Sequence, residues 1–387
     1  MSGADVSVVW VDKAADIDPA LWQDCFPPPL EGRWWYETLE GSGLEDQFRF
    51  LYGVVSVDGR AVAIAPAFRM DMQLRLVMPP LLLPAFDLLV KLFPPLRYQR
   101  TLFVGSPCAD EGHVGMLPGA DRSAVLRALQ TGLQQQVRRL GASMLVWKDF
   151  PAAWDADFER LAQSARLFRV TSFPGTVATL PGPGREDYLA ALSSMRRHNL
   201  KKKWRRSRDN LALAVEVRQA PDAATLDAVF GLFQQTYEKA TTRFERLDRR
   251  FFELIARLPQ AHFILLRAGE SGELVAFMLC FEADGYVINK FIGIDYARPR
   301  ECFLYFRLWE AALDWALSRG ATAIQSGQTG YRAKLDIGHR LQPLTNHCRH
   351  RHTLVHLVYA LLAKSVSWET LDPDLARHLQ AHPQKES

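Results

Sequence analysis

Side chains able to exchange protons or to bind a polar substrate gather around two apolar runs, residues 286–294 and 322–325. Glu282 and Asp295 flank the first run and are candidates for a general base, with a solvated turn position as the alternative for each. The other candidates lie within the first run, at the start of the segment between the runs, or at the end of the second run and in the turn after it: Asn289, Lys290, Tyr305, Gln325, Gln328, Tyr331 and Lys334. No Ser-His-Asp or Cys-His pattern can be recognised, so a covalent enzyme intermediate is not indicated.

A second candidate site is a basic segment. Eight Lys/Arg and no Asp/Glu lie between Ser193 and Arg208, while the whole chain carries +4 from 47 basic and 43 acidic residues. The rest of the sequence therefore carries −4, so the basicity describes one surface. Leu200 and Trp204 continue an apolar stripe, which predicts a helix. The segment is interpreted as a solvated face, as an RNA contact with Trp204 stacking on a base, or as a site for an acidic carrier protein or for phosphates of coenzyme A or anionic lipid.

Periodicity predicts the elements that position the first site. A strand over 286–294 leads through a polar turn into a helix over 303–319, which Gly320 ends, and a short strand over 322–325 follows. The first half contains a similar series: a hairpin over 48–68, a strand at 101–104, a helix at 123–140 and a strand at 143–147. We infer two copies of one α/β module, although any two α/β halves share such features.

The bulk properties are those of a globular protein. The chain has 387 residues, 48% of them hydrophobic, which favours two domains. Five scattered cysteines and no recognisable signal sequence favour a cytoplasmic protein with reduced thiols. The most apolar stretch, residues 74–98, is interrupted by prolines and charges, so no spanning helix is expected. We expect this stretch to pack on the core; an acyl-chain pocket or a patch for peripheral membrane contact is the alternative. No metal is expected, because Cys348, His350 and His352 have no second Cys/His pair nearby.

Four segments carry a resemblance to a known family: residues 34–48, 188–206, 233–255 and 286–334. They resemble the GNAT acyltransferase fold, and within it the FemAB-like and cellulose-biosynthesis-type tandem GNAT proteins. The resemblance implies an α/β (α+β) chain of two GNAT-like modules, each a mixed central sheet flanked by helices. We expect these at residues 1–175 and 176–370, with the active site in the second module and a polar tail at 371–387.

The resemblance also implies roles for single residues. It places a Gly-Tyr-x-x-Lys segment beside the acceptor, here Gly330, Tyr331 and Lys334. We therefore predict Tyr331 and Lys334 as catalytic contacts, with Asp295 or Glu282 as the base. The family's glycine-rich pyrophosphate loop is missing from residues 296–303, where Pro299 also removes a donor. Side chains are predicted to contact the donor's phosphates or carrier instead: Arg196, Arg197, Lys201, Lys202, Lys203, Arg298 and Arg300.

The function implied by the resemblance is N-acyl transfer. The acyl group would pass from a thioester donor, acyl-CoA or acyl-carrier protein, to an amine of a small or amino-acid-like acceptor by direct attack. One alternative is a FemAB-like transferase that moves an amino acid from aminoacyl-tRNA to a cell-wall precursor. Another is a degenerate, non-catalytic GNAT pair that binds RNA or anionic membrane through residues 196–208.

Overall fold

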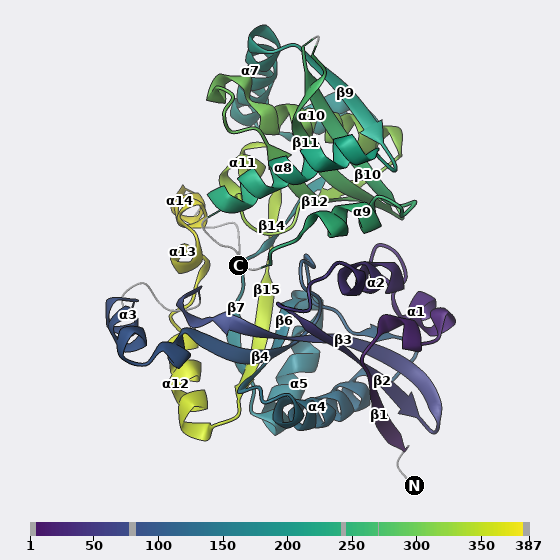
Figure 1. Ribbon diagram of the computed structural model, residues 1–387, viewed down its shortest axis with the longest axis vertical. Helices are drawn as coiled ribbons and strands as arrows, with labels where there is room; N and C mark the ends of the chain where they lie inside the picture. Colours follow the sequence, from purple (N-terminus) through teal and green to yellow (C-terminus); the bar gives the residue numbers. More distant parts are fainter. Residues whose placement is uncertain (1–4, 77–82, 241–244, 270, 382–387) are drawn as a thin grey trace.

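The computed structural model of the protein describes residues 5–76, 83–240, 245–269 and 271–381. In these residues two mixed sheets, each flanked by helices, form two modules that lie one above the other in Figure 1. The predicted α/β architecture is thus confirmed. No helix within the described ranges combines the length and the apolar character needed to cross a bilayer.

The first sheet follows the order β1-β2-β3-β4-β6-β15-β7, with β5 paired to β3. Its neighbours are antiparallel except for β4 and β6, which run parallel. The predicted hairpin over residues 48–68 is formed by β2 and β3. The strands are β1 (Val6–Val11), β2 (Arg49–Val57), β3 (Arg60–Gln73), β4 (Tyr98–Val104), β5 (Gly115–Met116), β6 (Met144–Pro151), β7 (Phe168–Thr171) and β15 (Leu344–His350).

The second sheet follows the order β14-β8-β13-β12-β11-β10-β9. Here β12 and β13 are the parallel pair, and the other neighbours are antiparallel. The strands are β8 (Gly175–Thr179), β9 (Leu213–Arg218), β10 (Ala261–Ala268), β11 (Glu273–Ala283), β12 (Tyr286–Ile294), β13 (Ala323–Gln325) and β14 (Arg340–Gln342).

The two sheets repeat one pairing scheme. In each, four antiparallel strands lead to a parallel pair, and two further antiparallel strands complete the sheet. The place beside the parallel pair is taken by β15 in the first sheet and by β8 in the second. Because β15 lies within residues 176–370, the expected second module contains a strand of the first sheet. This strand pairs with β6, which would otherwise expose an edge.

Helices flank the two sheets, and several start at a side-chain cap. Asp121 accepts a hydrogen bond from the backbone N–H of Ala124 at the start of α4, and Ser193 accepts one from Arg196 at the start of α7. The helices are α1 (Pro19–Cys25), α2 (Arg33–Gly41), α3 (Leu83–Leu92), α4 (Arg122–Arg139), α5 (Asp155–Ala165), α6 (Arg185–Ala191), α7 (Ser194–Asn210), α8 (Ala223–Lys239), α9 (Arg249–Ile255), α10 (Leu304–Ser318), α11 (Tyr331–Asp336), α12 (Thr353–Ala363), α13 (Trp368–Leu371) and α14 (Pro373–Ala381). Short 3₁₀ turns are η1 (Ala14–Asp16), η2 (Leu74–Leu76), η4 (Pro94–Arg97), η5 (Ala152–Trp154) and η6 (Arg300–Cys302).

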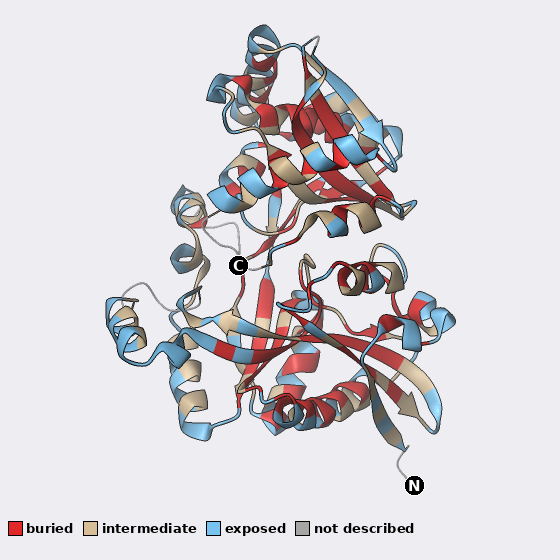
Figure 2. Ribbon diagram, viewed as in Figure 1, coloured by how far each residue is buried: buried red, intermediate tan, exposed pale blue. Residues whose placement is uncertain are grey.

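One hydrophobic cluster joins the two modules. The ring of Trp34 lies 5.1 Å from that of Phe281, and the ring of Trp35 lies 5.9 Å from that of Phe251. These rings belong to α2 of the first module and to β11 and α9 of the second. Buried residues accordingly run through both sheets in Figure 2. The modules therefore share apolar surface, and polar groups at their junction are held away from water.

The apolar stretch 74–98 does not pack as expected. Helix α3 has no buried residue, and the side chains of Leu88, Leu92 and Phe93 are exposed. The expectation of core packing is therefore wrong for this helix. Residues 77–82, which bear on the predicted acyl-chain pocket, lie outside the described ranges.

Candidate active site

The parallel strands of the second sheet pair over a short length only. Strands β12 and β13 are in register from Tyr286 and Ala323 to Ile288 and Gln325. Just beyond, Lys290 is the extra residue of a β-bulge, since Asn289 and Phe291 on either side pair with successive residues of β11. Bulges re-aim side chains and are common beside active sites. The predicted substrate-binding residues Asn289, Lys290 and Gln325 thus lie at or just beyond the point where the pairing of the two strands ends.

Lys290 forms a buried ion cluster with carboxylates of the first module. Its Nζ lies 2.5 Å from Glu31 Oε1 and 3.4 Å from Asp110 Oδ2, and its side chain is 1% exposed. The ammonium also lies 4.9 Å from the centre of the Trp35 ring. Burial acts to lower the pKa of Lys290, but Asp110 and Glu31 outweigh it, so the pKa is raised. Lys290 therefore stays charged and holds the two modules together at this point.

Glu111, next to Asp110, is a carboxyl group that titrates near neutrality. It lines a small cavity with Tyr36, Ser106 and His113. Burial, followed by repulsion from Glu31 and Asp110, raises the pKa of Glu111 to about 7. A carboxyl group with such a pKa suits proton transfer at neutral pH. No signal in the sequence marks Glu111, because its loop shows only scattered glycines and no local pattern reports burial.

Lys334 fixes the backbone that follows β13. Its Nζ donates to the carbonyl oxygens of Ser326, Gly327 at 3.2 Å and Gln328 at 3.0 Å. Burial lowers the pKa of Lys334 to about 7, although Asp110 opposes the shift. The segment 326–328 also touches the ion cluster, since a Cβ on Gly327 would lie 2.5 Å from Asp110 Oδ1. The predicted residue Lys334 is therefore connected to the cluster through this segment.

Two unpaired polar groups lie in this segment or on His339, which contacts it. Ser326 Oγ accepts from Asn289 Nδ2 at 3.2 Å and lies 3.0 Å from His339 Nε2. Burial lowers the pKa of His339 to about 3, so its ring is neutral at physiological pH. His339 Nδ1 and Gln328 Nε2 are buried and lack a hydrogen-bond partner among the described residues. Buried polar atoms of this kind mark positions for water or a ligand.

His339 also lines a groove of about 1070 Å³ in the second module. Helices α7, α11 and α14 and strand β14 contribute most of its lining, and Phe306 and Leu335 supply apolar contacts. Two acidic residues, Asp336 and Asp374, also line it. We call it the basic groove after its five Lys/Arg side chains: Arg196, Lys203, Arg332, Arg340 and Arg377.

The basic helix α7 is only partly directed at this groove. Lys203 forms an ion pair with Asp336 at 2.9 Å inside it, whereas Lys201 pairs with Glu186 at 3.3 Å. Arg197 donates to the carbonyl oxygen of Leu189 at 3.4 Å. Exposed side chains outside the groove lining include Lys202 and Arg205. The Lys and Arg side chains of α7 therefore fall into three groups. Some form contacts within the protein, some line the basic groove, and others are exposed outside it.

The predicted stacking of Trp204 on a base is wrong. The indole is 3% exposed, and its Nε1 donates to the carbonyl oxygen of Phe306 at 2.8 Å. Because the ring packs under α10, it cannot receive a nucleobase. Tyr305, predicted to bind substrate, packs edge-on against the Phe306 ring with centres 5.6 Å apart, and burial raises its pKa.

Three residues predicted to be catalytic, Glu282, Asp295 and Tyr331, form contacts outside the ion cluster. Glu282 is bound by Arg319 at 2.9 Å, and Asp295 by Arg298 at 3.1 Å. Tyr331 is fully buried, and its hydroxyl donates to the carbonyl oxygen of Pro174 at 2.9 Å.

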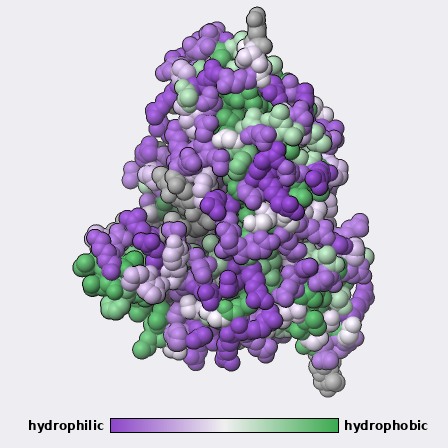
Figure 3. Space-filling view, in the orientation of Figure 1, coloured by the Kyte–Doolittle hydropathy of each residue, from purple (hydrophilic) through white to green (hydrophobic). Residues whose placement is uncertain are grey.

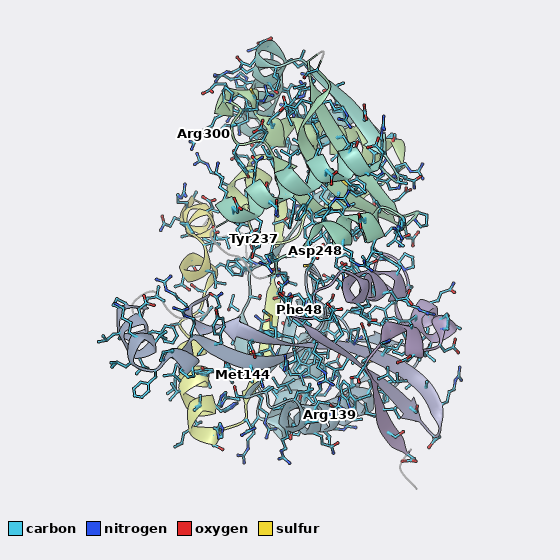
Figure 4. The ribbon with its side chains drawn as sticks, viewed as in Figure 1. Phe48, Arg139, Met144, Tyr237, Asp248 and Arg300 are labelled. Atoms are coloured by element: carbon cyan, nitrogen blue, oxygen red, sulfur yellow. The ribbon has the colours of Figure 1, made fainter. Side chains whose placement is uncertain are left out.

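Arg298 pairs with Asp295 and also with Glu273, while Arg300 projects from the surface of the second module (Figure 4). Within the described ranges, no three His, Cys, Asp or Glu side chains are placed to hold a metal ion.

The chain is similar to known proteins in sequence and in structure. Residues 109–364 match the family model FemAB-like, described as peptidoglycan biosynthesis/recognition. The structure of FemX is similar with a TM-score of 0.59 and 10% identity, covering 92% of this chain and 100% of FemX. L-PGS from Bacillus licheniformis gives a TM-score of 0.52 and 14% identity over 85% of this chain and 92% of its own.

A tandem GNAT protein from the clavulanic acid biosynthesis pathway gives a TM-score of 0.51 and 14% identity, over 89% and 98% of the two chains. No curated protein matches the sequence. At these identities the structural likeness shows the fold, and the predicted tandem GNAT architecture is confirmed.

Proposed function

The chain belongs to the FemAB-like family, and on this basis we propose that it transfers an aminoacyl group from aminoacyl-tRNA to an amine of a cell-wall precursor. The observation that carries the proposal is the basic groove, whose lining includes His339 with its buried, unpaired Nδ1. A phosphate-rich donor fits such a groove because Lys and Arg neutralise its backbone charge. The family description, peptidoglycan biosynthesis/recognition, supports the class of acceptor.

The reaction is direct attack on the ester of the donor. The acceptor nitrogen bonds to the carbonyl carbon, and the bond between that carbon and the ribose oxygen breaks. We place Glu111 as the base that takes the proton from the attacking nitrogen and returns it to the ribose oxygen, because burial raises its pKa to about 7. Lys334 acts as a positioning residue, since it holds the segment 326–328, which contacts both Asp110 and His339.

An acyl thioester is the second candidate donor. In its favour, no side chain caps the start of α10, and Arg300 is exposed just before it. A helix start with a nearby arginine suits a pyrophosphate. Against it, Pro299 removes one backbone donor from this turn, and Arg298 is already paired with Asp295 and Glu273. We therefore rank coenzyme A below the RNA-borne donor.

One assay separates these functions. The purified chain is incubated with a radiolabelled aminoacyl-tRNA pool and a cell-wall precursor peptide, and in parallel with acyl-CoA and the same peptide. Label in the peptide, lost in Glu111→Gln, supports the proposal. Acceptor-dependent release of free thiol from acyl-CoA supports the second candidate. Retention of RNA without either transfer contradicts both and favours a binding protein.

A further inference from the structure

An apolar surface is exposed on the first module. Of the sixteen large hydrophobic side chains that are exposed in the described residues, ten lie in or beside α3, η4 and α12. Single exposed hydrophobic residues are ordinary, but such a concentration marks an interaction surface. We call it the α3–α12 patch: Leu88, Leu89, Leu92, Phe93, Leu96, Tyr98, Leu354, Leu357, Val358 and Leu361.

The apolar stripe of α12 points away from the protein. Leu354, Leu357, Val358 and Leu361 follow helical spacing and are 53–79% exposed. The opposite side of α12 packs on the sheet, where the hydroxyl of Tyr359 lies 3.4 Å from Gln99 Nε2. This contact brings α12 beside the start of β4, directly after η4 and Tyr98. Figure 1 shows α3 and α12 on the same side of the first module, and Figure 3 shows hydrophobic residues gathered there.

The surroundings of the α3–α12 patch are positively charged. Residues 71–100 and 349–364 contain seven Lys/Arg and two Asp/Glu. Both acidic residues, Asp71 and Asp87, form ion pairs with arginines of the same region. Helix α12 itself has no Lys, Arg, Asp or Glu, and Arg351 and Lys364 stand exposed at its two ends. The patch is thus apolar at its centre and positively charged at its margins.

We propose that the α3–α12 patch docks the protein on the surface of an anionic lipid bilayer. Apolar helix faces flanked by Lys and Arg bind at the boundary between head groups and acyl chains. The leucines protrude, and a bilayer receives protruding side chains without a matching recess. A symmetric pairing of two copies through this patch would set one positively charged margin against another. The proposal does not depend on the identity of the transferred group.

Vesicle sedimentation of the full chain tests the proposal. The vesicles consist of phosphatidylcholine alone or of phosphatidylcholine with phosphatidylglycerol. We expect binding to the anionic vesicles, weakened at least about tenfold by Leu357→Ser with Leu361→Ser. Arg351→Gln and Lys364→Gln should each weaken binding about fivefold. The matched control is Val9→Ser with Val215→Ser, two exposed apolar residues elsewhere on the surface, which should bind as the wild type does.

The outcomes are distinct. Because the substituted leucines are exposed, the variants should keep the wild-type circular dichroism and melting temperature. Absence of wild-type binding to the anionic vesicles overturns the proposal, and so does equal binding by the leucine variant. A dimer in light scattering that the leucine variant converts to monomer, without vesicle binding, overturns it in favour of contact between two copies.

Discussion

Lys290 and Glu31 form an ion pair across the junction of the two modules, 2.5 Å apart in space and 259 residues apart in sequence. The bulge of β12 directs the ammonium out of the sheet, and Glu31, two residues before the start of α2, supplies the carboxylate. Asp110 completes the cluster and touches the backbone that Lys334 holds. The pair therefore both joins the modules and sets the charge beside the candidate base.

Lys290→Met should destabilise the protein by about 3–5 kcal/mol, because it leaves Glu31 and Asp110 buried without their cation. Adding Glu31→Gln should recover part of the loss. The free energy of unfolding, measured by chemical denaturation, checks both variants. Lys201→Met, which removes an exposed pair with Glu186, is the control and should cost less than about 1 kcal/mol. If the two substitutions changed the free energy of unfolding additively, this would contradict an energetic coupling between Lys290 and Glu31.

Glu111→Gln should lower the transfer rate at least about 100-fold, because it removes the proposed base. In the wild type, kcat/KM should rise with pH up to about 7, where Glu111 becomes ionised. A pH–rate profile checks this prediction. A variant that keeps both the wild-type rate and the same profile would exclude Glu111 as the base.

The same substitution should stabilise the protein above neutral pH. The pKa of Glu111 in the folded protein lies above its ordinary value of 4.5, so its contribution to stability is full below pH 4.5 and is lost as pH rises through about 7. Glutamine has no such loss. The variant should therefore gain up to about 3 kcal/mol on the wild type at pH 8, at about 1.4 kcal/mol per pKa unit, and nothing at pH 4. Melting temperatures of the variant and the wild type at pH 4 and pH 8 measure the difference. An equal change in melting temperature at both pH values would show that ionisation of Glu111 is not the cause.

Gly327→Ala should be more harmful than Gly330→Ala. Both glycines have positive φ, 56° and 62°, so both substitutions strain the backbone by about 1 kcal/mol. Only at Gly327 does the added Cβ meet another group, Asp110 Oδ1 at 2.5 Å, whereas nothing lies within 4 Å at Gly330. Thermal unfolding and transfer assays of both variants compare the two effects. Equal losses of stability and activity in the two variants would show that the contact between residue 327 and Asp110 has no effect.

Neutralising the basic groove should weaken RNA binding. Arg196→Gln and Arg332→Gln should each reduce the slope of log K against log salt by about 0.7–0.9, as expected when one phosphate contact is lost. Filter binding of tRNA over a range of salt concentrations measures the slopes. Arg205→Gln, on α7 but outside the groove lining, is the matched control and should leave the slope unchanged. An equal effect of all three would assign the binding to α7 as a whole.

The sequence by itself determined the elements whose signals are local. Turn dipeptides and alternation gave the hairpin of β2 and β3, and helical spacing with a terminal glycine gave α4 and α10. The duplicated order of these elements, with the resemblance of several segments, was enough for the tandem fold. Lys334 was singled out by the resemblance, through the Gly-Tyr-x-x-Lys segment, and its catalytic role stays a prediction.

Only the tertiary structure decided what depends on contacts between distant segments. Strand β15 joins the first sheet, and Lys290 meets Glu31, through pairings that no local pattern encodes. Trp204 and the leucines of α3 carry the same kind of apolar signal in the sequence, yet the first is buried and the others are exposed. Periodicity reports which side of an element is apolar but not what covers it. Since burial and neighbouring charges set a pKa, the titration of Glu111 near neutrality likewise follows from the folded chain alone.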